Sequence, residues 1–161
     1  MDDLDKTAAW RNDPEIKNMA LMHPFPVSME MEKEWFESNI KKINNRLIIL
    51  GIEFMESNQI IGFTKLYDIN WVHRYCYFGI IIGEKNMWGN GIGKETTELM
   101  IQYAFQTLNL RKILLEVVIM NEPAINLYKN LGFNVEGTLK NQVFINGAYS
   151  DVLLMAIFNN L

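Results

Sequence analysis

The sequence has 161 residues, the length of one compact domain, and we expect a single domain over residues 1–161. Hydrophobic residues make up 49%, aromatic residues 12% and charged residues 21%, an ordinary globular composition that excludes a disordered or low-complexity chain. The 15 Lys and Arg residues against 19 Asp and Glu residues give a net charge of −4. This balance argues against a general nucleic-acid binder, because affinity for phosphate backbones comes from clustered basic side chains.

The cysteine content and the apolar runs predict a cytoplasmic protein that does not enter a membrane. Cys76 is the single cysteine, so no intrachain disulfide can form. The first five residues are acidic and lack the apolar core of a signal peptide. The longest apolar runs, such as Leu47–Ile49 and Val152–Phe158, fall short of the ~18 residues that a membrane helix needs.

Prolines divide the first forty residues into helices and a loop. One short helix is expected to end just before Pro14, which is itself a favoured first helical position. Pro24 and Pro26 mark a loop. Ser28 can then cap a helix that runs to about Asn39. One side of that helix carries Met31, Trp35 and Phe36.

Strands are expected from position 46 onward. The segments Leu47–Met55 and Gln59–Tyr67 are separated by a turn signal and predict a hairpin. A second turn over Asp68–Arg74 leads into Tyr75–Ile82, a strand apolar enough to be buried on both faces. Gly79 within it predicts a bulge or a close backbone approach.

A glycine-rich loop over Gly83–Gly91 follows, and then a long helix to about Thr107. Another β-branched strand covers Lys112–Ile119. Helical spacing predicts that the long helix buries Ile92, Thr96, Leu99, Met100 and Tyr103, with Glu95, Glu98 and Gln102 opposite.

The last part of the chain predicts a short helix and a hairpin. Pro123 opens the helix and Gly132 closes it. Strands over Phe133–Ile145 and Tyr149–Phe158 are joined by Asn-Gly, a strong type I′ turn signal. The element order predicts an α/β (α+β) fold: a mixed, mostly antiparallel central sheet flanked by helices, with a parallel crossover through the long helix.

The segment from Trp88 to Lys94 lies between a strand and a helix and contains three glycines. Such glycines let backbone N–H groups converge into an anion-binding nest, and the helix that follows adds its free first-turn donors. The segment therefore suits a phosphate or pyrophosphate, or else is an ordinary strand-to-helix turn. A P-loop does not fit, because Glu95 follows the Gly-Lys pair, and a dinucleotide fingerprint needs wider glycine spacing.

Two motifs carry a resemblance to a known superfamily. Trp88, Gly91 and Gly93 resemble the Gln/Arg-x-x-Gly-x-Gly/Ala signature of the GNAT N-acetyltransferases, with Trp88 at the usual Gln/Arg position. The segment Asn121–Phe133 resembles the family's Asn-x-x-Ala-x-x-x-Tyr-x-x-x-Gly-Phe segment. From about position 69 to position 158 the chain is most similar to the ribosomal-protein and spermidine N-acetyltransferase branch.

This resemblance implies acetyl-CoA as a co-substrate, with no metal. It implies that the pyrophosphate binds the glycine-rich turn and that the pantetheine arm pairs with the strand before it. Relatives usually begin with a β-strand before the first helix; here that strand is short or missing, or the chain starts upstream. The implied cofactor-binding residues are Ile80, Ile81, Ile82, Trp88, Gly89, Asn90, Gly91, Ile92, Gly93, Lys94, Asn121 and Tyr128.

Two of these residues have alternative interpretations. Tyr128 matches the tyrosine that the family uses as general acid toward the leaving thiolate, and a phenol with a pKa near ~10 stays protonated at neutral pH. Its alternative is a surface tyrosine on an amphipathic helix. Asn121 matches a residue that binds the cofactor arm, and its alternative is a helix N-cap.

The general base is left open by the sequence. Tyr77 stands where relatives often carry a glutamate, and a neutral tyrosine is a poor base. Proton removal through water to Glu53, His73 or a backbone carbonyl is one expectation, and entry of an already neutral amine is another. His23 and His73 lack Cys or Asp partners at metal-site spacing.

The resemblance implies direct acetyl transfer to the primary amine of a small molecule, with a polyamine such as spermidine favoured. The alternatives are a nucleotide-linked amino sugar, a protein N-terminal amine, or a catalytically silent acyl-CoA-binding module. A small-molecule amine is thus the expected partner, with neither nucleic acid nor membrane, and the resemblance also implies a homodimer.

Overall fold

The computed structural model of the chain describes residues 2–40 and 44–159. Its helices are α1 (Asp2–Asn12), α2 (Pro14–Met19), α3 (Met29–Asn39), the 3-10 turn η1 (Lys85–Met87), α4 (Ile92–Gln102), the π-helical turn η2 (Tyr103–Thr107) and α5 (Glu122–Asn130). Its strands are β1 (Leu47–Phe54), β2 (Gln59–Asn70), β3 (Tyr75–Ile82), β4 (Lys112–Val118), β5 (Asn134–Ile145) and β6 (Ala148–Phe158).

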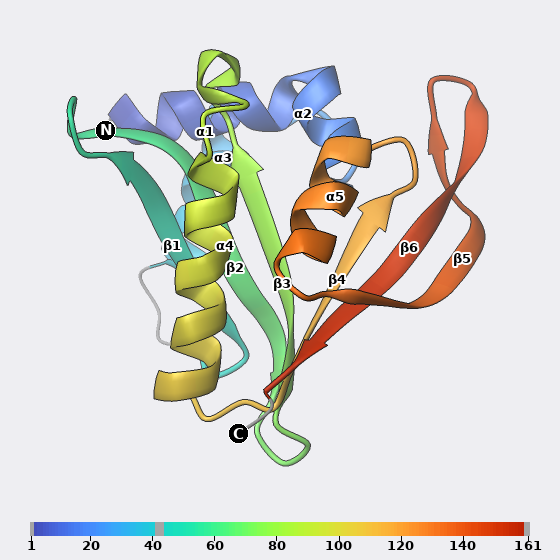
Figure 1. Cartoon of the computed structure of the whole chain (residues 1–161). Coiled ribbons are helices and arrows are strands. Elements are labelled where there is room, and N and C mark those ends of the chain that lie inside the picture. Colours follow the sequence, from blue (N-terminus) through green and yellow to red (C-terminus); the bar gives the residue numbers. More distant parts are fainter. Residues whose placement is uncertain (1, 41–43, 160–161) are drawn as a thin grey trace.

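The strands form one six-stranded sheet in the order β1-β2-β3-β4-β6-β5. The β3–β4 pair is parallel and the other four pairs are antiparallel. The crossover between β3 and β4 runs through α4, and helices flank the sheet (Figure 1). The predicted fold class is therefore confirmed. In the described part of the chain the sheet begins only at β1, after three helices, as expected from the short or missing first strand.

The two parallel strands separate soon after they pair. β3 and β4 are in register only from Tyr75 opposite Lys112 to Tyr77 opposite Leu114. Beyond that point the strands diverge toward the upper end of the molecule, so that they form a fork (Figure 1). The sequence did not predict this fork, which positions the candidate site.

The two faces of the sheet are covered differently. The main core lies on the face under α4 and α5 and includes Phe78, Leu115 and Phe133. A smaller cluster on the other face joins α1 and α2 to β2 and β3. Its buried members are Trp10, Ile16, Phe63 and Ile81.

Burial along β3 corrects one expectation. Cys76 and Phe78 are buried, whereas Tyr75, Tyr77 and Gly79 are only partly buried. The strand is therefore not buried on both faces along its whole length, because α1 and α2 cover the second face only near its upper end. Gly79 causes no bulge, since the β2–β3 register is continuous around it.

Helix α3 begins as predicted, and the side chain that it buries fully is a charged one. The Ser28 hydroxyl accepts a hydrogen bond from the Met31 N–H at 3.2 Å, which confirms the N-cap. Met31, however, is 49% exposed, and the fully buried residue is Glu32. Glu32 faces inward because it forms an ion pair at 3.3 Å with Arg11 of α1.

Helix α4 is shorter than predicted. It ends at Gln102 and continues as the π-helical turn η2, in which the Leu108 N–H donates to the Tyr103 carbonyl. Leu99 was expected in the core but is 59% exposed. The buried stripe has shifted along the helix because Thr97, Met100 and Ala104 face the sheet.

The predicted turns differ in accuracy. The Asn-Gly hairpin is confirmed as type I′, because Asn146 and Gly147 have φ of +52° and +84°. Gly132, with a φ of +95°, follows α5 as predicted. The turn after β2 is shorter than predicted, since β2 continues to Asn70 past a register shift that follows Tyr67.

Replacing Gly83 with alanine is expected to lower the free energy of unfolding by about 2 kcal/mol, because overpacked cores typically lose 1–3 kcal/mol. A Cβ at Gly83 would lie 2.0 Å from Cδ2 of the buried Trp10. Gly137→Ala is the matched control, since a Cβ there would meet nothing within 4 Å. Urea denaturation of both variants gives the comparison, and equal stabilities would contradict the close approach.

Candidate active site

A cleft of about 840 Å³ occupies the fork between β3 and β4. Strands β2, β3 and β4, helix α2, the start of α4 and helix α5 all contribute to its walls. Of the residues predicted from the sequence, those that line it are Ile80, Ile81, Ile82, Trp88, Gly89, Gly91, Ile92, Gly93, Lys94, Asn121 and Tyr128. Asn90 is not in the lining, and its amide lies 3.4 Å from the Asn86 carbonyl.

The glycine-rich turn leads into α4 at the upper end of the cleft. Gly89 and Gly91 have φ of +78° and +82°, a region that side chains rarely adopt. A Cβ on either would meet nothing within 4 Å, so the backbone conformation and not crowding requires glycine. The Glu95 N–H makes the first helical bond to the Gly91 carbonyl. The N–H groups of residues 92–94 are thus the free first-turn donors that suit an anion.

Hydrogen-bond directions along β3 decide which backbone groups face the fork. The Gly83 N–H donates to the Ile61 carbonyl of the β2 side at 2.8 Å. Because bonding direction alternates along an antiparallel strand, Ile81 also bonds toward β2, and Ile80 and Ile82 point into the fork. Of the three predicted residues, two therefore offer backbone groups to a ligand, and Ile81 lines the cleft only with its side chain.

Trp88 binds one of the β3 backbone groups that point into the fork, the carbonyl of Ile82. Its indole N–H donates to the Ile82 carbonyl at 2.8 Å, and the side chain is 39% exposed. Trp88 therefore ties the glycine-rich turn to the end of β3 and forms part of the cleft wall.

The side chain of Asn121 caps α5. Its Oδ1 accepts from the Ala124 N–H at 3.3 Å, and its Nδ2 lies 3.4 Å from the Met19 carbonyl. The N-cap interpretation is thus present in the structure, and the same amide links α5 to α2. Because Asn121 also lines the cleft, the two interpretations are compatible.

Tyr128 enters the cleft from the α4 and α5 face of the sheet. It is 8% exposed, and its ring packs edge-on against Phe78 with centroids 6.3 Å apart. Burial raises the pKa of Tyr128 to about 12, so the phenol remains protonated at neutral pH. Tyr128 is therefore not the surface tyrosine that the sequence left as an alternative.

The polar residues of the cleft that the sequence did not predict include Lys65, Tyr67 and Glu116. They lie on the sheet face opposite Tyr128. Burial raises the pKa of Tyr67 to about 12, with a smaller contribution from the charge of Glu116. A charged residue inside the apolar strand β4 was the available signal for Glu116.

Gly79 allows Lys65 to reach this part of the cleft. The two residues are paired across β2 and β3, and a Cβ on Gly79 would lie 2.9 Å from Cε of Lys65. The Lys65 ammonium lies 4.5 Å from the centre of the Tyr67 ring. Of the two expectations for Gly79, the bulge is wrong, and the close approach is made by the side-chain stem of Lys65 and not by another backbone.

The side chains that the sequence suggested for removing a proton from the amine either lie outside the cleft or cannot act as a base. Tyr77 packs against Tyr67 with ring centroids 5.5 Å apart, and burial raises its pKa, so it holds its proton more firmly. Neither Glu53 nor His73 lines the cleft. Glu53 lies on the edge strand β1, two strands from β3.

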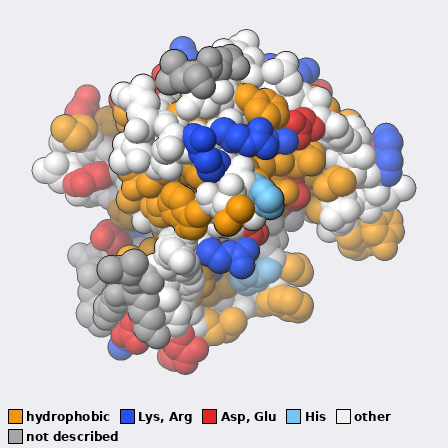
Figure 2. All heavy atoms as spheres, turned by 90° about the horizontal axis from the view of Figure 1, so that it is seen from below, with side chains coloured by type: hydrophobic (Ala, Val, Ile, Leu, Met, Phe, Trp, Pro, Cys, Tyr) orange, Lys and Arg blue, Asp and Glu red, His pale blue; other side chains and the backbone are white. Residues whose placement is uncertain are grey.

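His73 lies in the turn before β3, at the opposite end of that strand from the glycine-rich turn (Figure 1). Eight strand residues separate the two ends, a span of roughly 26 Å. Figure 2 views the molecule from this lower end, where histidine side chains lie among basic and hydrophobic ones. His73 and Glu53 are therefore wrong as candidates for the proton route.

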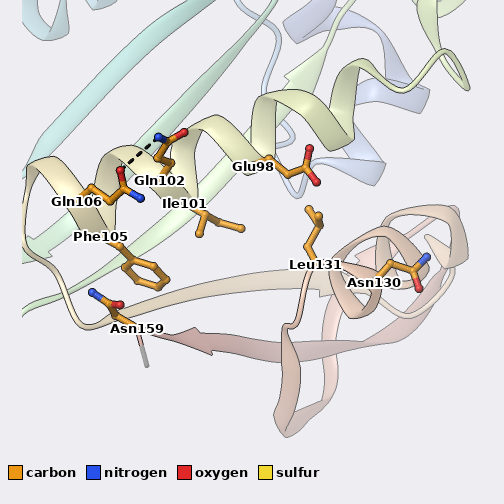
Figure 3. Close-up of a pocket in the computed structure, with 8 residues that line it drawn as sticks. All are labelled: Glu98, Ile101, Gln102, Phe105, Gln106, Asn130, Leu131 and Asn159. Atoms are coloured by element: carbon orange, nitrogen blue, oxygen red, sulfur yellow. Dashed lines mark hydrogen bonds between the residues drawn. The ribbon is translucent and has the colours of Figure 1, made fainter. Parts of the chain in front are cut away.

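A second hollow, of about 500 Å³, lies between α4, η2 and the end of α5 (Figure 3). It shares no lining residue with the cleft. Its one ionisable lining residue, Glu98, is 3.9 Å from Lys94 on the same helix. No convergent set of polar groups marks this hollow as a site.

Within residues 2–40 and 44–159, no helix has both the length and the apolar content needed to cross a membrane. In the same part of the chain, no three His, Cys, Asp or Glu side chains are grouped as a metal site would require.

Comparison with known proteins identifies the family. The family model described as "Acetyltransferase (GNAT) domain" matches residues 1–134. The chain belongs to the GNAT acetyltransferase family. It is thus an N-acetyltransferase, and the fork, the glycine-rich turn and Tyr128 are parts of a GNAT fold.

Individual relatives agree with this assignment. The spermidine N(1)-acetyltransferase of Escherichia coli (strain K12) is 31% identical over 159 residues, which are 99% of this chain and 82% of the relative. That of Vibrio cholerae serotype O1 is 34% identical over 149 residues, 92% of this chain and 83% of the relative. The crystal structure of spermidine N-acetyltransferase from Vibrio cholerae in complex with CoA and spermine has a TM-score of 0.88 and 32% identity, covering 97% of this chain and 89% of that chain.

Proposed function

We propose that this GNAT protein transfers the acetyl group of acetyl-CoA directly to a primary amine of a polyamine such as spermidine. The observation that carries the proposal is the fork, which has an anion-binding turn at one end, a protonated tyrosine on one face and a carboxylate on the other. Similarity over nearly the whole chain to a spermidine N-acetyltransferase solved with CoA and spermine supports the substrate class.

Acetyl-CoA fits the groups that the cleft offers. The free N–H groups at the start of α4 and the two left-handed glycines suit its pyrophosphate. The backbone of Ile80 and the N–H of Ile82 suit its pantetheine arm, as an added strand would. The Ile82 carbonyl is already occupied by Trp88. The thioester supplies an activated acetyl carbon, and the protein supplies position and proton transfer.

Tyr128 is suited to protonate the departing sulfur. Its phenol is held against Phe78 and Phe133, so its position in the cleft is fixed. With a pKa raised to about 12, it carries a proton throughout the range in which an amine can be acetylated.

The acceptor side of the cleft is suited to a cation. Carboxylates of Glu15 and Glu116 line it, and the whole chain carries a net charge of −4. A polyamine carries several ammonium groups, so both features favour its approach. Lys65 also lines this side and opposes a cation, and burial lowers its pKa.

Self-association in the cytoplasm is part of the proposal. A related structure is described as the dodecameric structure of spermidine N-acetyltransferase from Vibrio cholerae, which supports assembly into a multimer. The homodimer that the resemblance implies is a unit from which such a multimer could be built.

Release of the CoA thiol in the presence of different amines tests the proposed function. We expect the wild-type protein to release thiol with spermidine or spermine faster than with an amino-sugar nucleotide or an N-terminal peptide. Mass spectrometry should find a product heavier by one acetyl group. No thiol release with any amine of the panel would contradict the proposal and favour a silent acyl-CoA-binding module.

A further inference from the structure

The acceptor side of the cleft contains a lysine that has no carboxylate partner. Lys65 lies in β2, lines the cleft and is half-buried. In the part of the chain that the structure describes, residues 2–40 and 44–159, no carboxylate oxygen lies within 4 Å of its ammonium. Asp68, whose charge acts on Lys65, is itself 3.4 Å from Arg46. A half-buried cation without a counter-ion is unfavourable until an anion binds it, so Lys65 is a binding group for an anion.

Gly79 gives the Lys65 side chain a path across β3. The two residues are paired across β2 and β3, and a Cβ on Gly79 would lie 2.9 Å from Cε and 3.4 Å from Cγ of Lys65. The stem of the lysine therefore lies over the glycine, in space that any other side chain would fill. Because β3 borders the fork, this path brings the ammonium from β2 toward the cleft between β3 and β4.

Tyr67 supplies a second hydrogen-bond donor beside the ammonium. It lies two residues along β2 on the same sheet face, and the ammonium of Lys65 is 4.5 Å from the centre of its ring. Tyr67 also lines the cleft, and its pKa, raised to about 12 by burial, keeps the hydroxyl protonated. No side chain or backbone group among the described residues accepts a hydrogen bond from this hydroxyl. An ammonium and a phenol that face the same space suit a carboxylate or a phosphate.

The other charged groups of this face do not take the place of such an anion. Arg11 lies near enough for its charge to lower the pKa of Lys65, but its guanidinium is paired at 3.3 Å with the buried Glu32. Glu116 lines the cleft from β4, on the other side of the fork. The acceptor side thus presents a cation on one strand and a carboxylate on another, an arrangement complementary to a molecule that carries both charges.

We propose that the cleft accepts a second class of substrate, primary amines that carry a carboxylate or a phosphate a few bonds from the nitrogen, with Lys65 and Tyr67 binding the anion. This inference rests on the proposed acetyl transfer. With the anion held on β2, the neutral nitrogen bonds to the acetyl carbon, the carbon–sulfur bond breaks, and the proton that the nitrogen loses passes to the sulfur. A polyamine brings no anion, so the charge at position 65 favours the second class over the first.

Matched pairs of amines test the inference through the rate of thiol release. We compare 4-aminobutyrate with butylamine, and phosphoethanolamine with ethanolamine, so that the members of each pair differ in the anionic group. The wild type should show a kcat/KM about 10-fold higher for the anionic member of at least one pair, the effect of one hydrogen bond between charged groups. The pair that shows the preference identifies the anion as a carboxylate or a phosphate.

Three variants assign the preference to Lys65. Lys65→Met removes the ammonium and keeps a stem of similar length, so it should lower the preference about 10-fold and raise kcat/KM for spermidine. Lys65→Arg keeps a cation and should keep the preference. Lys140→Met removes a lysine that is 75% exposed and outside the cleft, and it should match the wild type. CoA binding by calorimetry should be the same in all of them, because the cofactor side is untouched.

The outcomes separate this inference from the proposed function. If the wild type acetylates spermidine but prefers the uncharged member of both pairs, the inference is overturned and the proposed function stands. If it acetylates the anionic amines and not spermidine, the inference stands and the polyamine is the wrong acceptor. If it acetylates no amine, both are overturned. An equal preference in the wild type and in Lys65→Met would overturn the role of Lys65.

Discussion

Replacing Tyr128 with phenylalanine is expected to lower kcat about 10³-fold, within the range reported for general acid catalysis. The substitution removes one oxygen and keeps the ring that packs between Phe78 and Phe133. Without the phenol, the departing thiolate has no protein proton donor at this position. Stopped-flow or steady-state measurement of thiol release with spermidine gives the ratio.

Two controls distinguish loss of the acid from loss of structure. Affinity for CoA, measured by calorimetry, should be unchanged in Tyr128→Phe. Tyr103→Phe alters a tyrosine that packs on the same core but does not line the cleft, and it should keep the wild-type kcat.

The pH dependence gives a third criterion. The pKa of Tyr128 is raised by burial to about 12, so the phenol loses its proton only as pH rises toward that value. The defect of Tyr128→Phe should therefore be equally large at neutral and mildly alkaline pH. A variant with full kcat at any pH in that range would contradict the acid role.

Local signals explain why much of the fold could be predicted. Ser28 caps a helix, and Asn146-Gly147 forms a type I′ turn. Both features depend only on a few consecutive residues, so they can be predicted from the local sequence. Exposure was harder to predict, because it depends on contacts with residues that are distant in the sequence. Met31 faces solvent because Arg11, from another helix, draws Glu32 inward. Leu99 is exposed because the sheet contacts a neighbouring stripe of α4.

The candidate site also has a part that could be predicted from local sequence and a part that could not. The glycine-rich turn and the helix bearing Tyr128 are continuous segments, so their resemblance to the family's motifs can be recognised in the sequence. The acceptor side is built from residues far apart in the chain, such as Lys65 and Glu116. They meet only because β2, β3 and β4 are neighbours and because β3 and β4 part after three residue pairs. A strand pattern records which residues share a face, but it does not record where two strands separate.

Replacing Glu32 with alanine is expected to lower the free energy of unfolding by about 3 kcal/mol, the lower end of the range for breaking a buried ion pair. Glu32 is fully buried, and the side chain of its partner Arg11 is only 10% exposed. The guanidinium also lies 4.0 Å from the centre of the Trp35 ring, so it cannot easily move to solvent. Burial lowers the pKa of Arg11 and the charge of Glu32 opposes that effect, so without Glu32 a desolvated cation remains.

Because the cost comes from the stranded charge and not from lost attraction alone, removing both charges should restore stability. The double variant Arg11→Met, Glu32→Leu replaces the pair with apolar groups of similar length, and we expect it to be within about 1 kcal/mol of the wild type, as buried pairs often are when both partners are replaced. Arg11→Met alone should leave Glu32 buried and unpaired and be as unstable as Glu32→Ala. Denaturant titration of these variants, with Glu32→Leu alone added, completes a double-mutant cycle. If Glu32→Ala lost less than 1 kcal/mol, Arg11 would have to reach water in the native state, and the packing of α1 against α3 would be looser than its buried contacts imply.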